Sequence, residues 1–105
     1  MTEITVTELK QRRDAGEELV LLDVREPEEL ATVSIPWAKA IRMGEIPVRY
    51  AELPSDTPIV VMCHHGGRSE RVTRFLNANG YENAVNLAGG IDDWAASIDP
   101  SLPRY

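Results

Sequence analysis

The amino-acid sequence predicts an α/β protein with three layers, in which a small, mostly parallel β-sheet of four to five strands is flanked by helices. Residues 19–24 and 58–63 are largely apolar and do not alternate, which is typical of parallel strands covered on both faces. Segments with helical spacing or helix-end signals alternate with these runs, as they do in α/β folds. The length of 105 residues and the hydrophobic content of 43% suit a single domain over residues 1–105.

The first helix is expected over residues 5–16. Thr5, with Glu8 three residues later, has the spacing of a capping box, and Gly16 is a typical helix stop. After the first apolar run, Pro27 stands early in a segment that predicts one or two helical turns. The other elements expected in this half are a strand over residues 19–24 and a short helix or irregular crossover over residues 46–54.

In the second half, a strand ending at Cys63 is followed by a helix expected over residues 69–79. Apolar residues recur in this helix at helical spacing, and Gly80 is suited to end it. Residues 98–105 contain two prolines and predict a loose C-terminal tail. The other elements expected are a strand over residues 83–87 and a last short helix over residues 90–97.

Composition excludes several classes of partner. The net charge is −6 with scattered Lys and Arg, so nucleic acid and anionic membranes are poor partners. No run of 18 apolar residues is present, and we therefore expect no membrane span. The polar N-terminus has no signal-peptide core, so we expect a cytoplasmic protein. Its size and acidic surface are compatible with a monomer, which we expect.

The most informative stretch is "CHHGGRS", residues 63–69. Its cysteine ends a strand, where parallel sheets bind their ligands, and it can be a buried thiol, a metal ligand or a nucleophile. A metal site fails on counting, because Cys63, His64 and His65 are consecutive and the chain has no other cysteine or histidine. We therefore expect no metal, and a lone cysteine also forms no intramolecular disulfide.

A nucleophilic Cys63 is favoured by the residues that follow it. A helix N-terminus lowers the pKa of a nearby thiol, and a helix is expected to begin close to Ser69. Gly66 and Gly67 let the backbone turn several N–H groups inward to form an anion-binding nest. Arg68 can add a fork-shaped cation for an oxyanion. Because this loop is polar and rich in glycine, we expect Cys63 at the rim of the core and not within it.

His64 and His65 leave three interpretations open. A histidine beside a cysteine can act as a general base. Neighbouring side chains on a curling loop usually point apart, however, so both rings can instead line the rim and touch a substrate or partner. Solvent-exposed side chains without a function are an equally good interpretation.

The chain resembles the rhodanese-like domain family of single-domain sulfurtransferases. The resemblance rests on three motifs in the right order, and it covers nearly the whole length. One segment departs from the family pattern, because "VSIPWA", residues 33–38, replaces the usual Gly-His-Ile-Pro-Gly-Ala. Trp37 in this segment can fill the core or form an exposed contact surface. The three motifs are "LLDVREPEEL", residues 21–30, "CHHGGRS", residues 63–69, and "GYENAVNLAGGIDDW", residues 80–94.

The resemblance implies a two-step sulfur transfer without a cofactor. Cys63 takes the sulfane sulfur of a donor such as thiosulfate, becomes a persulfide and passes the sulfur to a thiol or a sulfur-carrier protein. Asp23 and Arg25 lie near the same end of the sheet, where an ion pair that fixes the loops is their expected role. The residues expected to form the substrate-binding loop around the nucleophile are His64, His65, Gly66, Gly67, Arg68 and Ser69.

Two other functions stay open. Small cysteine-dependent phosphatases and arsenate reductases of the same fold also use a loop cysteine with an arginine. Their pattern has five intervening residues, whereas four separate Cys63 from Arg68, and the shorter loop suits a single sulfur atom better than a phosphate. The second alternative is a module that carries persulfide sulfur or binds a partner with little turnover.

Overall fold

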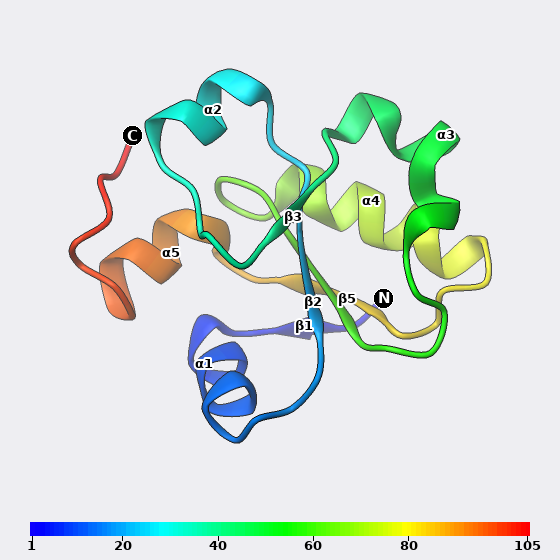
Figure 1. The fold of residues 1–105 in the computed structure, drawn as a ribbon, viewed down its shortest axis with the longest axis horizontal. Coiled ribbons are helices and arrows are strands. Elements are labelled where there is room, and N and C mark those ends of the chain that lie inside the picture. Colours follow the sequence, from blue (N-terminus) through cyan, green and yellow to red (C-terminus); the bar gives the residue numbers. More distant parts are fainter.

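The computed structural model describes residues 1–105 and contains a five-stranded sheet in the order β1-β5-β4-β2-β3. Every pair of neighbouring strands is parallel, and helices flank the sheet (Figure 1). The predicted α/β class with a small parallel sheet is therefore confirmed. The strands are β1 (Glu3–Ile4), β2 (Val20–Asp23), β3 (Lys39–Ala40), β4 (Ile59–Met62) and β5 (Ala84–Leu87).

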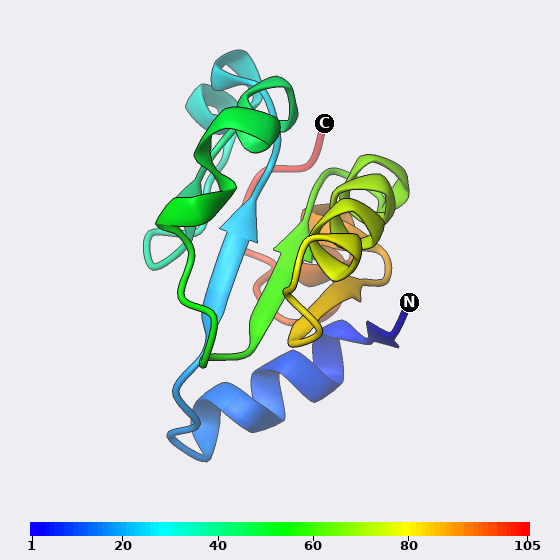
Figure 2. The ribbon, with the colours of Figure 1, turned by 90° about the vertical axis from the view of Figure 1, so that its right-hand side faces the viewer.

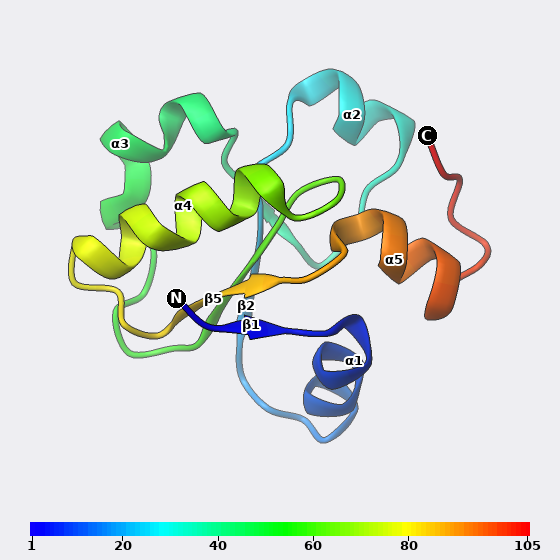
Figure 3. The same cartoon turned by 180° about the vertical axis from the view of Figure 1, so that it is seen from behind.

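The helices divide between the two faces of the sheet. One side carries α1 and α5, and the other carries α3 and α4 (Figures 1 and 3). The short helix α2 lies beyond the carboxyl end of β2 (Figure 2). None of these helices is long and apolar enough to cross a membrane. The helices are α1 (Val6–Asp14), α2 (Pro27–Thr32), α3 (Ile46–Arg49), α4 (Gly67–Ala78) and α5 (Gly90–Ser97), with single 3-10 turns at η1 (Met43–Glu45) and η2 (Tyr50–Glu52).

The sheet separates two apolar cores, which explains why its central strand is apolar throughout. Within β4, Ile59 and Val61 face the core under α3 and α4, whereas Val60 and Met62 face the core under α1 and α5. All four side chains are completely buried. Successive residues of a strand point to opposite faces, so a strand between two cores needs no polar positions.

Local signals placed the helix ends well. Thr5 caps α1 in a capping box, in which the Thr5 hydroxyl accepts from the Glu8 backbone N–H and the Glu8 carboxylate accepts from the Thr5 backbone N–H. Pro27 is the first residue of α2, as expected. The helix α4 begins at Gly67, two residues before the predicted start, because Gly66 adopts φ = +121° and turns the chain directly into the helix.

Two features of the fold differ from the predictions or extend them. The five strands agree with the predicted number of four to five, but the sequence patterns did not locate β1 and β3, which have only two residues each. The expected loose C-terminal tail is wrong, because Leu102 packs against the core on the α1 and α5 side. In addition, Arg104 forms a two-point ion pair with Asp92, and Tyr105 contacts the candidate site described below. The tail therefore folds back over the domain.

The unusual segment at residues 33–38 is part of the core. Val33 and Ile35 are buried, and Trp37 meets Trp94 edge-on with the ring centroids 6.1 Å apart. The guanidinium of Arg13 lies 3.8 Å from the centroid of the Trp37 ring, which is the geometry of a cation–π contact. Trp37 is therefore half-buried and packs against the core on the α1 and α5 side.

Candidate active site

The loop after β4 lies at the centre of the carboxyl edge of the sheet. Cys63 directly follows β4, which has β2 on one side and β5 on the other. After Cys63 the chain curls through three residues, 64–66, into α4, beside the start of α5 (Figure 3). The position is the one at which parallel sheets bind ligands.

The sulfur of Cys63 lies inside a ring of hydrogen-bond donors. The backbone N–H of Gly66 donates to Sγ at 3.0 Å, and the hydroxyl of Ser69 donates at 3.3 Å. Burial raises the pKa of the Cys63 thiol, but hydrogen bonds from the Ser69 hydroxyl and from the backbone N–H groups of Ser69, Gly66 and Arg68 outweigh it, so the pKa is lowered overall. The loop therefore stabilises a thiolate.

The expected place of Cys63 at the rim of the core is wrong. Its exposed fraction is only 1%, and its side chain joins the apolar cluster that contains Val61 and Val72. The reason is that the loop curls back over the strand end and places its N–H groups on top of the sulfur. Burial and a nucleophilic environment therefore occur together, although the sequence presented them as alternatives.

Two further elements hold the backbone of the loop. The first turn of α5 donates from the N–H of Ile91 to the Cys63 carbonyl at 2.9 Å and from the N–H of Asp92 to the His64 carbonyl at 3.1 Å. From β5, the side-chain amide of Asn86 donates to the Gly66 carbonyl at 3.3 Å. Asn86 is 1% exposed and was not predicted. Its signal was a lone polar residue within an apolar strand.

The two histidines do not point apart, which corrects that expectation. Their ring centroids lie 3.9 Å apart, and the His64 ring also stacks on the ring of Tyr105 at 3.8 Å with an interplanar angle of 7°. Neither ring makes a hydrogen bond to the Cys63 sulfur, whose partners are Gly66 and Ser69. The structure therefore gives no support to a histidine base in contact with the thiol.

Arg68 is not the free cation that the sequence suggested. Its two terminal nitrogens bind the two carboxylate oxygens of Glu29, on α2, at 2.6 and 2.8 Å. The Arg68 backbone N–H still faces the thiolate. Gly67, the other expected loop residue, is exposed at the start of α4. Glu29 was missed because it belongs to a distant segment that only the fold brings to the loop.

Asp23 and Arg25 form the ion pair that we expected near this end of the sheet. Nη2 of Arg25 lies 2.8 Å from Asp23, and both side chains are at most 1% exposed. Arg25 also donates to the backbone carbonyls of Glu29 at 3.3 Å and of Val33 at 2.8 Å. Arg25 thereby fixes the middle and the carboxyl end of α2 beside the loop.

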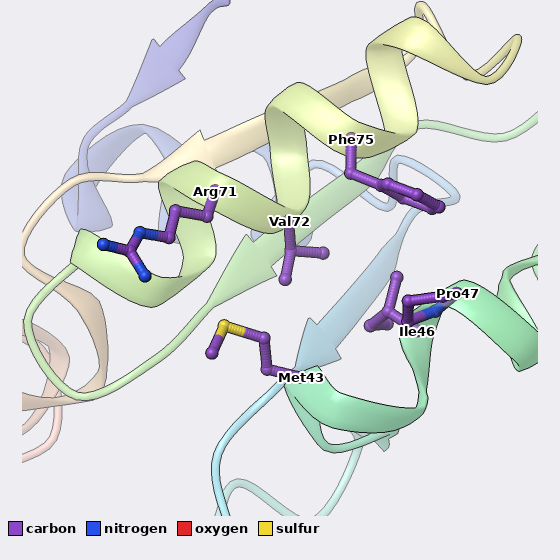
Figure 4. A pocket seen from close by; sticks show the side chains of 6 residues that line it. All are labelled: Met43, Ile46, Pro47, Arg71, Val72 and Phe75. Atoms are coloured by element: carbon purple, nitrogen blue, oxygen red, sulfur yellow. The ribbon is translucent and has the colours of Figure 1, made fainter.

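The two surface hollows lie outside this sulfur site. One, of about 370 Å³, lies between α4 and the segment that contains η1 and α3, and its lining is mostly apolar (Figure 4). The other, of about 450 Å³, lies at residues of β2, α2 and the segment that follows α2. Cys63 lines neither hollow. The residues of the first are Met43, Ile46, Pro47, Arg71, Val72 and Phe75.

The parallel sheet and the hydrogen-bonded loop define an α/β domain with a single buried cysteine at the carboxyl edge of its sheet. The model of the rhodanese-like domain matches residues 5–97, and the chain therefore belongs to the rhodanese-like domain family. This confirms the resemblance drawn from the three motifs. As a member of this family, the protein is a transferase of the rhodanese type.

Two relatives of similar length carry sulfurtransferase names, and a longer relative is named a sulfur carrier protein. The Bacillus subtilis protein "Putative sulfurtransferase YtwF" is 42% identical over 93% of this chain and 94% of its own. A protein of Allochromatium vinosum named "Sulfurtransferase" is 39% identical over 90% of this chain and 89% of its own. The Bacillus subtilis "Putative sulfur carrier protein YrkF" is 36% identical over 92% of this chain but only 52% of its own length.

A solved structure shows the same fold. The rhodanese-like domain protein from Staphylococcus aureus is 35% identical and superposes with a TM-score of 0.86, covering 100% of this chain and 99% of that one. Together with the names of the relatives, this similarity supports a role in sulfur transfer.

Proposed function

We propose that Cys63 receives the sulfane sulfur of a small donor such as thiosulfate, carries it as a persulfide and passes it to a thiol. The observation that carries this proposal is the ring of donors around the sulfur, with the Gly66 N–H at 3.0 Å and the Ser69 hydroxyl at 3.3 Å. Such a ring lowers the pKa of the thiol and suits an anion of the size of one sulfur atom. The sulfurtransferase names of the relatives support the same reaction class.

In the first step, the Cys63 thiolate attacks the outer sulfur of thiosulfate. A bond forms between Sγ and that sulfur, the sulfur–sulfur bond of the donor breaks, and its electron pair leaves with sulfite. The negative charge then lies on the outer sulfur of the persulfide. Fixed N–H groups at the start of α4 stabilise this charge without having to reorganise.

In the second step, an acceptor thiolate attacks the outer sulfur of the persulfide. A new sulfur–sulfur bond forms on the acceptor, and the Cys63 thiolate is released as the leaving group. The loop that lowers the pKa of the thiol also makes it a better leaving group. We propose a small thiol or a sulfur-carrier protein as the acceptor, which the name of the relative YrkF supports.

Mass spectrometry of the intact protein tests the proposal. After mixing with thiosulfate, the wild-type chain is expected to gain the mass of one sulfur atom, and a thiol acceptor is expected to remove it. Cys63→Ala, which lacks the nucleophile, is the control and should gain nothing. The proposal is overturned if the wild-type protein forms no adduct, or if the alanine variant forms it equally well.

A further inference from the structure

The only arginine in the active-site loop is held by a carboxylate. Nη1 and Nη2 of Arg68 bind Oε1 and Oε2 of Glu29 at 2.6 and 2.8 Å, which is the strong two-point geometry of an arginine–carboxylate pair. The Arg68 side chain is 33% exposed and that of Glu29 is 19% exposed. The two ends of this pair come from α4 and α2, and together they carry no net charge.

Glu29 is held in place on every side. Besides the two bonds from Arg68, its carboxylate accepts a hydrogen bond from the Tyr105 hydroxyl at 2.6 Å and one from the Glu26 backbone N–H at 3.1 Å. The hydrogen bonds from Arg68 are the main cause that lowers the pKa of Glu29 to about 2. The carboxylate is therefore ionised in any assay near neutral pH.

This neutral pair matters because the nucleophile and its donor are both anions. Thiosulfate carries two negative charges, so its attack by a thiolate gathers three at the loop. A free arginine would offset part of this repulsion, but Glu29 cancels the charge of Arg68. The charge of the neighbouring Arg25 is likewise neutralised by Asp23, whose Oδ2 lies 2.8 Å from Nη2 of Arg25. The loop therefore offers mainly backbone N–H groups to an incoming donor.

We propose that Glu29 determines donor specificity by neutralising Arg68, so that the site prefers sulfane donors with at most one negative charge, such as thiol persulfides, over dianionic thiosulfate. This inference rests on the proposed function. With a persulfide R–S–SH, the Cys63 thiolate takes the outer sulfur, the sulfur–sulfur bond of the donor breaks, and R–S⁻ leaves with its electron pair. The proton stays on the transferred sulfur.

Two donors that differ by one charge test the proposal. Thiosulfate and methanethiosulfonate both present a sulfane sulfur on an oxidised sulfur, but methanethiosulfonate has one negative charge and releases methanesulfinate. The rate constant for adduct formation on Cys63 is measured with each donor by mass spectrometry at low ionic strength. The ratio of the two rate constants, thiosulfate over methanethiosulfonate, reports the preference for the dianion and cancels any general loss of reactivity.

The variants change the charge of the pair in single steps. Glu29→Gln leaves a charge of +1 and should raise the ratio about tenfold. Arg68→Gln leaves −1 and should lower it by a similar factor, whereas the double variant is neutral and should return close to the wild-type ratio. The matched control is Glu28→Gln, on the same helix, because Glu28 is exposed and Arg68 pairs with Glu29 and not with Glu28. It should change the ratio by less than about twofold.

The outcomes separate the two proposals. If the adducts form but the ratio does not follow the charge of the pair, donor specificity does not come from Glu29 and the inference is overturned. If no donor forms an adduct on the wild-type protein, the proposed function itself fails. Circular dichroism checks that each variant is folded. Where a single variant is unstable, the neutral double variant still tests the proposal.

Discussion

The reactivity of a single side chain, Cys63, depends on a balance between burial and hydrogen bonding. Burial opposes the thiolate, but the donors from Ser69, Gly66 and Arg68 outweigh burial and lower the pKa. We therefore expect the midpoint of alkylation by iodoacetamide against pH to lie below that of the same chain unfolded in urea. Because the pKa of the thiol is lower in the folded chain than in the unfolded chain, the thiolate stabilises the fold at pH values above the unfolded pKa. This stabilisation is lost as the pH falls through the folded pKa. A midpoint equal to that of the unfolded chain would contradict the hydrogen-bonded loop.

The Ser69 hydroxyl is the one side-chain donor to the sulfur. Hydrogen bonds to charged groups contribute about 1.5–3 kcal/mol, so Ser69→Ala should clearly raise the pKa of Cys63. The alkylation midpoint of this variant measures the shift. Ser55→Ala, which removes an exposed hydroxyl in a loop that does not touch the site, should leave the midpoint unchanged. An unchanged midpoint in Ser69→Ala would mean that the hydroxyl does not stabilise the Cys63 thiolate.

At this scale the sequence predicted the local part of the site and missed the long-range part. The glycine turn and the helix start follow Cys63 within a few residues, so their effect on the thiol could be derived from spacing. The pair between Arg68 and Glu29 joins residues 39 positions apart, and its existence depends on where α2 packs. The same reason hid the contact between Asn86 and the loop.

Among the elements, α5 has the tightest junction with the loop. A Cβ on Gly90 would lie 2.4 Å from the Cys63 carbonyl oxygen and 2.5 Å from that of His64, and φ there is +57°. We expect Gly90→Ala to lower the free energy of unfolding by more than about 2 kcal/mol, measured by urea denaturation. Gly16→Ala is the matched control, because Gly16 also has positive φ but open space around it.

The Gly16→Ala control measures the cost in stability of positive φ alone, so its difference from Gly90→Ala gives the cost of the steric clash. Gly16→Ala should cost only the backbone strain of a left-handed residue, about 1–2 kcal/mol, and should leave the reactivity of Cys63 unchanged. Gly90→Ala should also shift the alkylation midpoint, because it displaces the Cys63 and His64 carbonyls, which are part of the loop itself. Equal costs in the two variants would mean that the loop has room to move away.

Elements with their own sequence signals were predictable, and elements defined by pairing were not. The capping box of α1 and the apolar run of β4 are local features that the chain carries wherever it folds. The strands β1 and β3 have two residues each, and they exist only because β1 pairs with β5 and β3 pairs with β2. Nothing in a two-residue segment distinguishes it from a loop.

At the scale of the whole molecule, the C-terminal tail contacts both the apolar core and the candidate active site. Leu102 packs on one core, and Tyr105 bonds Glu29 and stacks on His64. Removing residues 102–105 should lower the free energy of unfolding by about 1–2 kcal/mol and speed alkylation of Cys63. Urea denaturation and the alkylation rate at fixed pH measure both effects. An unchanged unfolding midpoint would contradict the packing of the tail.

The prolines of the tail predicted a loose segment, and their local effect is real, since residues 98–105 contain no helix or strand. Irregular backbone is nevertheless compatible with a fixed position when side chains find partners. Those partners, Glu29 and His64, lie far from the tail in sequence. The local composition therefore predicted that the tail has no helix or strand, but it did not predict that side-chain contacts hold the tail in place.

The place of β4 in the middle of the sheet has a consequence for how the protein loses activity. The strand has a bonded neighbour on both sides and a core on both faces, so its amide hydrogens should be among the slowest in the chain to exchange with heavy water. Fraying at β1 or β3 can proceed while Cys63 keeps its place. Heat or denaturant should therefore abolish sulfur transfer only when the whole domain unfolds. We expect no inactive state that is still folded.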